Sequence, residues 1–268
     1  LLAPGAAEIL PQVKNPDTFV YATIGDVDTL DPGYAYDTAS HLIIFQIYEP
    51  LLMYKGSSVK ELVPLLAEKV PSKTNGLISP DGLAYTFVIR KGMKFHNGYD
   101  LTPEDIKYSL MRFMLQDRAG GPSALLLEPI AGVTSTRDSL GNISLDFKTV
   151  DQRIEIKGQK LIIHLPKPYA PFLTLMAQWS YTASKKWAME HGDWDGTEAA
   201  WKKFNNPKKE DSYFFEHANG SGPFLLETWD KNTKQISLAR NERYWRAPAK
   251  LKRIVIKKID EFATRRLL

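Results

Sequence analysis

The side chains of this 268-residue sequence that could carry catalysis or hold a metal are few and scattered. Its histidines form neither the His-Glu-x-x-His pair that binds zinc nor part of a Gly-x-Ser-x-Gly nucleophile elbow. His96 lies in a turn-rich stretch, where a structural hydrogen bond is expected more often than ligation or catalysis. The sequence therefore predicts no catalytic residue, no metal and no cofactor, and we expect a protein that is not an enzyme. The histidines are His41, His96, His164, His191 and His217.

Two further patterns imitate chemical motifs. The adjacent Glu104 and Asp105 could form a carboxylate pair, but neighbouring helical residues point in different directions, and both suit a first helical turn. Asn219-Gly-Ser-Gly222 lacks the lysine of a P-loop and the spacing of a dinucleotide fingerprint. We interpret the first pattern as helix capping and the second as a tight turn.

Aromatic side chains are better candidates for function, because they bind peptides and sugars by stacking and apolar burial. Trp179 and Tyr181 follow a helical or turn segment where a ligand-facing loop should lie, although core packing would also explain them. Tyr34, Tyr36 and Asp37 lie in a loop beyond the first predicted strand, where α/β folds usually present binding groups. These five residues are ligand-binding candidates.

Composition excludes several classes of protein. The 35 basic and 31 acidic residues give a formal charge of only +4, so nucleic-acid binding is not expected. The absence of cysteine excludes disulfides and thiolate metal sites. No apolar run is long enough to span a bilayer, and the opening Leu1–Ala7 lacks the pattern of an intact signal peptide. An exported protein would therefore have lost its signal already.

Apolar alternation and helical spacing predict a chain of mixed strands and helices. The expected helices cover Ile43–Leu51 and Lys185–Glu190. The expected strands are Phe19–Thr23, Tyr85–Arg90, Asn142–Phe147, Arg153–Ile156, Leu161–Leu165, Gly222–Trp229, Gln235–Arg240 and Leu251–Ile259.

The clearest local signal is the start of another helix near residue 102. Thr102 suits the N-cap, Pro103 suits the first helical position, and Asp105 completes a capping box. The helix that follows should bury one apolar stripe. That stripe consists of Ile106, Leu110, Phe113 and Met114.

The end of the sequence is typical of an unfinished unit. Asp260 suits the N-cap of a new helix, but only Glu261–Leu268 follow it. Helices this short are marginal alone, and their apolar residues here have nothing after them to pack against. We therefore expect a truncated fragment or an absent second half.

Three segments, in this order, resemble the peptide-binding (dipeptide/oligopeptide, family 5) class of extracytoplasmic solute-binding proteins of ABC importers. The first is Thr29-Leu-Asp-Pro32. The second runs from Ser79-Pro-Asp-Gly82 through Lys91-Gly-Met-Lys-Phe-His-Asn-Gly98 to Leu110. The third is Gly220-Ser-Gly-Pro-Phe-Leu-Leu226, leading to Arg240-Asn-Glu-Arg-Tyr-Trp245. The resemblance identifies the chain as the N-terminal portion of such a protein.

The resemblance implies an α/β fold, a periplasmic-binding-protein-like lobe with a mixed sheet plus an inserted strand-rich subdomain, with the second lobe absent. It places the first lobe in residues 1–51 and 167–259, the inserted subdomain in 52–166, and the start of the hinge crossing or a truncated helix in 260–268. In that family the turn that holds Ser221 and Gly222 borders the cleft, which adds both to the ligand-binding candidates. The acidic partner of a peptide's amino terminus lies in the missing lobe, so no residue here is given that role.

The resemblance further implies that the intact protein captures a peptide, or a similar solute such as an oligosaccharide, between two lobes and delivers it to ABC permease subunits. It implies a periplasmic or extracytoplasmic location, with a membrane-anchored full-length form as an alternative, and no nucleic-acid partner. Two other functions stay open. One is a hydrolase that processes peptides or sugars in the same cleft. The other is a lobe that acts as an interaction module for the missing C-terminal lobe.

Overall fold

The computed structural model describes residues 15–267. Residues 1–14 and Leu268 lie outside the described residues. The opening segment Leu1–Ala7 and the start of the predicted first lobe therefore lie outside them as well. The strands are β1 Thr18–Thr23, β2 Leu52–Tyr54, β3 Leu62–Pro64, β4 Ala84–Val88, β5 Ile154–Lys157, β6 Lys160–His164, β7 Phe224–Asp230, β8 Gln235–Arg240 and β9 Arg253–Lys258. The α-helices are α1 Thr38–Ile47, α2 Pro103–Gln116, α3 Ala124–Ala131, α4 Phe147–Asp151, α5 Phe172–Gln178, α6 Lys185–Glu190 and α7 Phe262–Arg266. Short 3-10 helices are η1 Trp201–Phe204, η2 Lys209–Asp211 and η3 Tyr213–Phe215.

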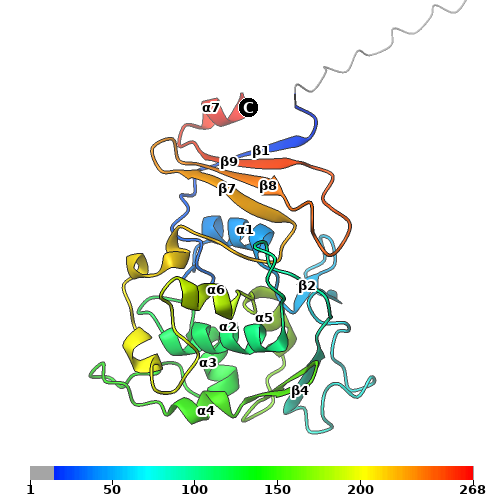
Figure 1. The fold of residues 1–268 in the computed structure, drawn as a ribbon, viewed down its shortest axis with the longest axis vertical. Helices are drawn as coiled ribbons and strands as arrows, with labels where there is room; N and C mark the ends of the chain where they lie inside the picture. Colours follow the sequence, from blue (N-terminus) through cyan, green and yellow to red (C-terminus); the bar gives the residue numbers. More distant parts are fainter. Residues whose placement is uncertain (1–14, 268) are drawn as a thin grey trace, which may run out of the picture.

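One four-stranded sheet joins the two ends of the described chain in the order β1-β9-β8-β7. Strand β1 pairs with β9 in parallel, whereas the β8–β9 and β7–β8 pairs are antiparallel. Helix α1 lies under one face of this sheet, and α7 lies beyond the other face (Figure 1). The predicted mixed sheet is therefore confirmed, and it covers one side of the helical layer of the molecule.

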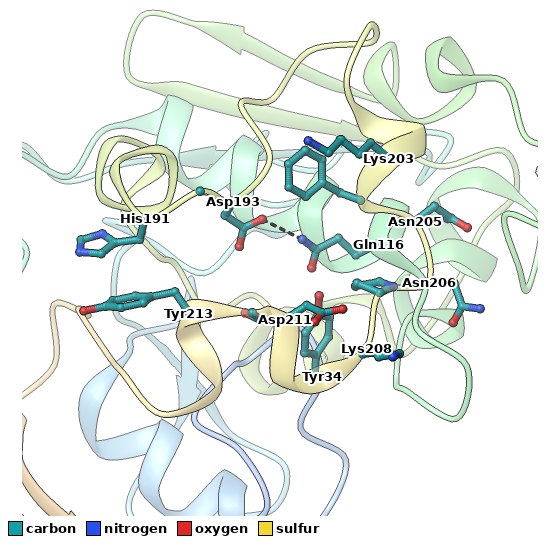
Figure 2. A pocket seen from close by; sticks show the side chains of 14 residues that line it. Tyr34, Gln116, His191, Asp193, Lys203, Asn205, Asn206, Lys208, Asp211 and Tyr213 are labelled. Carbon is teal, nitrogen blue, oxygen red and sulfur yellow. Dashed lines mark hydrogen bonds between the residues drawn. The ribbon is translucent and has the colours of Figure 1, made fainter.

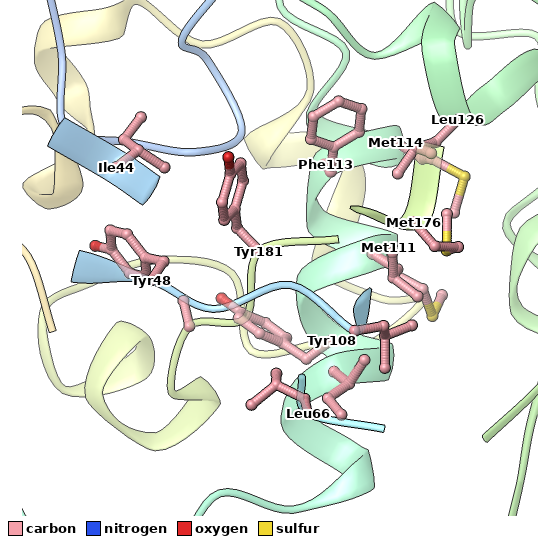
Figure 3. Close-up of a cluster of buried hydrophobic side chains, with 14 of the residues drawn as sticks. Ile44, Tyr48, Leu66, Tyr108, Met111, Phe113, Met114, Leu126, Met176 and Tyr181 are labelled. Atoms are coloured by element: carbon pink, nitrogen blue, oxygen red, sulfur yellow. The ribbon is translucent and has the colours of Figure 1, made fainter. Parts of the chain in front are cut away.

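Helix α2 is the centre of that helical layer. Its capping box is confirmed, because the Asp105 carboxylate accepts hydrogen bonds from the Thr102 backbone N–H at 2.9 Å and from the Thr102 hydroxyl at 2.8 Å. The predicted apolar stripe is buried, and the remaining faces are buried as well, since Arg112 and Gln116 are each 3% exposed. Side chains from α1, α2, α3 and α5 meet around α2 in one continuous core (Figure 3). A helix buried on nearly every side holds its polar residues in fixed positions.

The segment from residue 52 to residue 166 contains the β2–β3 pair, the antiparallel β4-β6-β5 sheet and helices α2, α3 and α4. The predicted strands around Tyr85, Ile154 and Leu161 are confirmed with ends shifted by a residue or two. The division of the chain into a first lobe and an inserted subdomain stays a prediction.

The prediction of a strand over Asn142–Phe147 is wrong. Ile143 forms only an isolated bridge to Arg137, and Asp146 instead caps α4 by accepting a hydrogen bond from the Lys148 backbone N–H at 3.2 Å. A short acidic side chain before a buried aromatic residue favours a helix start over continued strand pairing.

The predicted cap of the last helix is wrong by one position. Glu261, and not Asp260, caps α7, because its carboxylate accepts a hydrogen bond from the Ala263 backbone N–H at 3.0 Å. The carbonyl of Asp260 instead accepts a hydrogen bond from the Arg265 guanidinium at 2.8 Å.

Candidate functional site

The loop between β1 and α1 is fixed to the helix that follows it. Helix α1 begins at Thr38, earlier than the sequence predicted, because the Asp37 carboxylate accepts a hydrogen bond from the Ser40 backbone N–H at 2.8 Å. The Ser40 hydroxyl in turn accepts from the backbone N–H groups of Asp28 at 3.0 Å and Thr29 at 3.2 Å. The loop and the first turn of α1 therefore position each other.

A buried ion cluster anchors the same loop to α2. The Arg112 guanidinium donates two hydrogen bonds of 2.7 Å to the Asp31 carboxylate and one of 2.8 Å to Asp193. These three side chains are at most 5% exposed. Burial alone would lower the pKa of Arg112, but the charges of Asp193 and Asp31 raise it well above its ordinary value. Arg112 therefore stays charged throughout the physiological range, and its hydrogen bonds hold the loop against the helical layer.

Four rings gather beside this loop, between the start of α1 and the end of α5. The Trp179 ring centroid lies 6.0 Å from that of Tyr36 and 4.6 Å from that of His41. The His41 ring lies 5.9 Å from the Tyr181 ring, and Phe113 of α2 supports Trp179 from 5.9 Å. We name Tyr36, His41, Trp179 and Tyr181 the aromatic group.

Exposure within the aromatic group decreases from the surface inward. Tyr36 is 60% exposed, Trp179 and His41 are half-buried, and Tyr181 is 6% exposed. An exposed ring beside a half-buried ring, on a frame held by buried hydrogen bonds, is a surface on which a ligand could stack.

His41 adds a polar atom to this surface. Its Nε2 is buried and has no hydrogen-bond partner among residues 15–267. Burial lowers the pKa of His41, and a hydrogen bond to the Ala35 backbone and the charge of Asp37 only partly oppose this effect. The ring is therefore mostly neutral at pH 7, and in a neutral imidazole one of the two nitrogens accepts a hydrogen bond. Because this nitrogen is buried, a ligand N–H or O–H could donate to it only after one of the neighbouring rings moves aside.

The other candidates from the sequence have structural contacts. Tyr34 is 4% exposed, and its ring lies 5.5 Å from the Arg112 guanidinium. Asp37 is the cap of α1. Ser221 is fully buried, and its hydroxyl donates to Glu49 at 2.8 Å. Gly222 donates its N–H to the Ile47 carbonyl, at the opposite end of α1 from Tyr36 and about 15 Å away along the helix.

The structure therefore brings Tyr36, Trp179 and Tyr181 together and leaves the Gly-Ser-Gly turn apart from them. This turn is tight because two backbones cross there. A Cβ on Gly220 would lie 2.0 Å from the Ile47 carbonyl oxygen, and one on Gly222 would lie 2.6 Å from the Gln46 carbonyl oxygen. Only glycine permits such an approach.

Sequence analysis missed His41 as a site residue. Its spacing was the available signal, because a helix capped at Asp37 places His41 one turn into α1, next to the loop that holds Tyr36. The ion pair between Asp31 and Arg112 joins positions 81 residues apart and has no local signal.

Within residues 15–267, no helix is long and apolar enough to cross a membrane. The same described range contains no cluster of three or more side chains placed to ligate a metal.

Known proteins share this sequence pattern. Residues 61–268 match the family described as bacterial extracellular solute-binding proteins, family 5 middle. The oligopeptide-binding protein OppA of Bacillus subtilis (strain 168) is 30% identical over 228 residues, which cover 84% of this chain and 36% of that protein. The probable D,D-dipeptide-binding periplasmic protein DdpA of Escherichia coli (strain K12) is 24% identical over 253 residues, which cover 94% of this chain and 41% of that protein.

The fold is shared as well. The periplasmic binding protein DppA from Helicobacter pylori, solved in complex with the peptide STSA, has a TM-score of 0.67 at 23% identity and matches 93% of this chain. The chain spans 36% of the length of OppA and 44% of the length of this DppA. Because the family match covers most of the sequence and the mixed α/β fold agrees with it, this chain belongs to family 5 of the bacterial extracellular solute-binding proteins.

Proposed function

We propose that the chain contributes one face of a solute-binding site and that the aromatic group forms this face. In the intact protein, two lobes would close on the solute, and the protein would deliver it to an ABC permease. The observation that carries this proposal is the buried, unpartnered Nε2 of His41 behind the exposed Tyr36 and the half-buried Trp179. A peptide supplies both flat apolar surface and N–H donors, which are the two features that this surface can bind.

Peptides are our first ligand class, because OppA of Bacillus subtilis is named for oligopeptides and the Helicobacter pylori DppA structure contains a peptide. An oligosaccharide, which would offer O–H groups to His41, is the second. We propose that Tyr36, His41 and Trp179 touch the solute, whereas Asp37 and Tyr181 hold these rings in place and Tyr34 packs on Arg112. Ser221 and Gly222 then fix the far end of α1.

We further propose that the protein works outside the cytoplasm, as its family description states, and binds its solute without chemical change. One of the two lobes would consist of residues 1–51 and 167–259, with residues 52–166 as the inserted subdomain. Because closure buries the solute on both faces, one lobe alone should bind the solute weakly.

The test is to titrate the chain with trialanine and with maltotriose and to measure the affinity for each by NMR. We expect Trp179→Ala to weaken trialanine binding about tenfold, which corresponds to roughly 1.4 kcal/mol of lost stacking and burial. Trp229→Ala, on β7, is the matched control and should leave the affinity unchanged. Equal effects of the two substitutions would contradict the assignment of the aromatic group.

His41 supplies an independent readout. Since burial lowers the pKa of His41, its ring becomes protonated only as the pH falls below 7, and the protonated ring no longer accepts a hydrogen bond. Trialanine affinity should therefore decrease as the pH falls below 6.5, the ordinary pKa of histidine. His41→Phe should bind more weakly at pH 7 and show no such dependence. A pH dependence that survives in His41→Phe would exclude His41 as the acceptor.

A further inference from the structure

A pocket that borders the buried ion cluster at Asp193 is not used by the proposed function. It has a volume of about 380 Å³ and is lined by the end of α2, the loop after α6 and the segment from η1 to η3 (Figure 2). Tyr34 and Gln116 form its inner wall, and Tyr213 and His191 form one side. We name this cavity the η pocket. Its volume lies within the range of small-molecule sites.

The inner wall of the η pocket holds an unsatisfied acceptor. Gln116 is 3% exposed, and its Oε1 has no hydrogen-bond partner among residues 15–267. Its amide orientation is fixed, because Nε2 donates to the Asp193 carboxylate at 2.9 Å. Figure 2 shows this amide between Asp193 and Tyr34. The oxygen therefore requires a donor that the described chain does not supply.

The Tyr34 hydroxyl is the second functional group at the inner wall. Burial raises the pKa of Tyr34, so the hydroxyl stays protonated and can both donate and accept. Two adjacent hydroxyl groups on a ligand match this pair, since one can donate to Gln116 Oε1 while the other accepts from Tyr34. The exposed carboxylate of Asp211 provides a further acceptor at the rim.

The charges that line the η pocket decide which class of hydrogen-bond-donating ligand fits it. The Asp193 charge is neutralised by Arg112 at 2.7 Å, so the inner wall carries no free anion to pair with an ammonium group. The exposed Lys203 and Lys208 line the pocket and would repel a cation. A neutral molecule that carries several hydroxyl groups avoids this repulsion and still offers many donors.

We propose that the η pocket binds a small neutral polyhydroxylated molecule, a polyol or monosaccharide, whose neighbouring hydroxyls bond to Gln116 and Tyr34. This site is separate from the aromatic group, because none of Tyr36, His41, Trp179 and Tyr181 lines the η pocket. It would give the protein a second ligand independent of the transported solute.

The experiment titrates the chain with D-glucose, using saturation-transfer NMR, and compares four variants, which are Tyr34→Phe, Gln116→Met, Tyr54→Phe and Trp179→Ala. Tyr34→Phe removes one hydroxyl and keeps the ring packed on Arg112, and Gln116→Met removes the acceptor. We expect the apparent Kd for D-glucose to rise at least fivefold in each. Tyr54→Phe, on β2, is the matched control and should bind like the parent chain. Circular dichroism checks folding, and Tyr34→Phe alone decides the question where Gln116→Met does not fold.

Three results would overturn the proposal. The first is no D-glucose signal from the folded parent chain. The second is binding of putrescine, a diammonium probe, in preference to D-glucose. The third is a D-glucose signal that Trp179→Ala abolishes and Tyr34→Phe leaves intact, because this would place the sugar on the aromatic group. Loss of trialanine binding in Trp179→Ala with D-glucose binding retained would support both sites separately.

Discussion

Replacing Arg112 with methionine tests the view that the buried ion cluster holds the loop between β1 and α1 in place. The substitution preserves much of the side-chain volume but leaves the carboxylates of Asp31 and Asp193, which are 0% and 5% exposed, without their cation. Breaking a buried ion pair by removing one partner costs about 3–5 kcal/mol, and two carboxylates here share one guanidinium. We expect the free energy of unfolding to fall by roughly 4 kcal/mol, measured by urea denaturation with tryptophan fluorescence.

An exposed pair of nearly the same length supplies the control. Lys94 lies 2.6 Å from Asp100, compared with 2.7 Å for Arg112 and Asp31, but the two side chains are 56% and 72% exposed. Lys94→Met should therefore cost less than about 1 kcal/mol, because solvent screens the pair. Similar losses in the two variants would refute the reasoning, since they would mean that burial does not decide the strength of these contacts.

Two further predictions concern the junction between α1 and the Gly-Ser-Gly turn. His96 lies at this junction, because its Nε2 is 3.0 Å from the Gly222 carbonyl oxygen. Burial lowers the pKa of His96 to about 4 from 6.5, so the unfolded chain takes up a proton first on acidification. The free energy of unfolding should be highest above pH 6.5 and should fall by up to about 3 kcal/mol as the pH approaches 4. Urea denaturation midpoints should depend less on pH in His96→Gln than in the parent chain. An equal dependence in both would mean that other groups cause the loss. Gly220→Ala places a Cβ 2.0 Å from the Ile47 carbonyl oxygen and should lower stability by about 3 kcal/mol or more in thermal denaturation, whereas an unchanged melting temperature would mean that the turn can move away.

Local signals were sufficient for much of the fold. Thr102, Pro103 and Asp105 predict the start of α2 because a capping box is complete within four consecutive positions. The β7–β8 hairpin and the β5–β6 hairpin were predictable for the same reason, since alternation and turn residues act between neighbours. The same logic failed at Asp146, where alternation continued through a residue that caps a helix.

The candidate site was predictable only in part. Tyr36 and Trp179 were chosen because loops after strands and helices carry exposed aromatic residues, and the structure places their rings 6.0 Å apart. The role proposed for His41 depends on a nitrogen without a partner among residues 15–267. The ligand proposed for the η pocket depends on the orientation of the Gln116 amide, which is fixed by its hydrogen bond to Asp193. Residue types and spacing do not record which polar atoms remain without a partner.

Both ends of α1 are fixed by polar groups that touch no ligand. At its start, Asp37 and Ser40 bind the helix to its own entry loop, and Arg112 holds that loop through Asp31. At its other end, buried Glu49 follows the helix and accepts hydrogen bonds from Ser221, Tyr244 and Trp245.

Helix ends are the places where local unfolding normally begins, so these contacts suppress fraying at both ends of a ten-residue helix. A binding surface that is already ordered loses less conformational entropy when a solute arrives. Weakening either end should therefore lower solute affinity at the aromatic group even though its rings are unchanged. Polar residues far apart in the sequence would in this way set the affinity of an aromatic site.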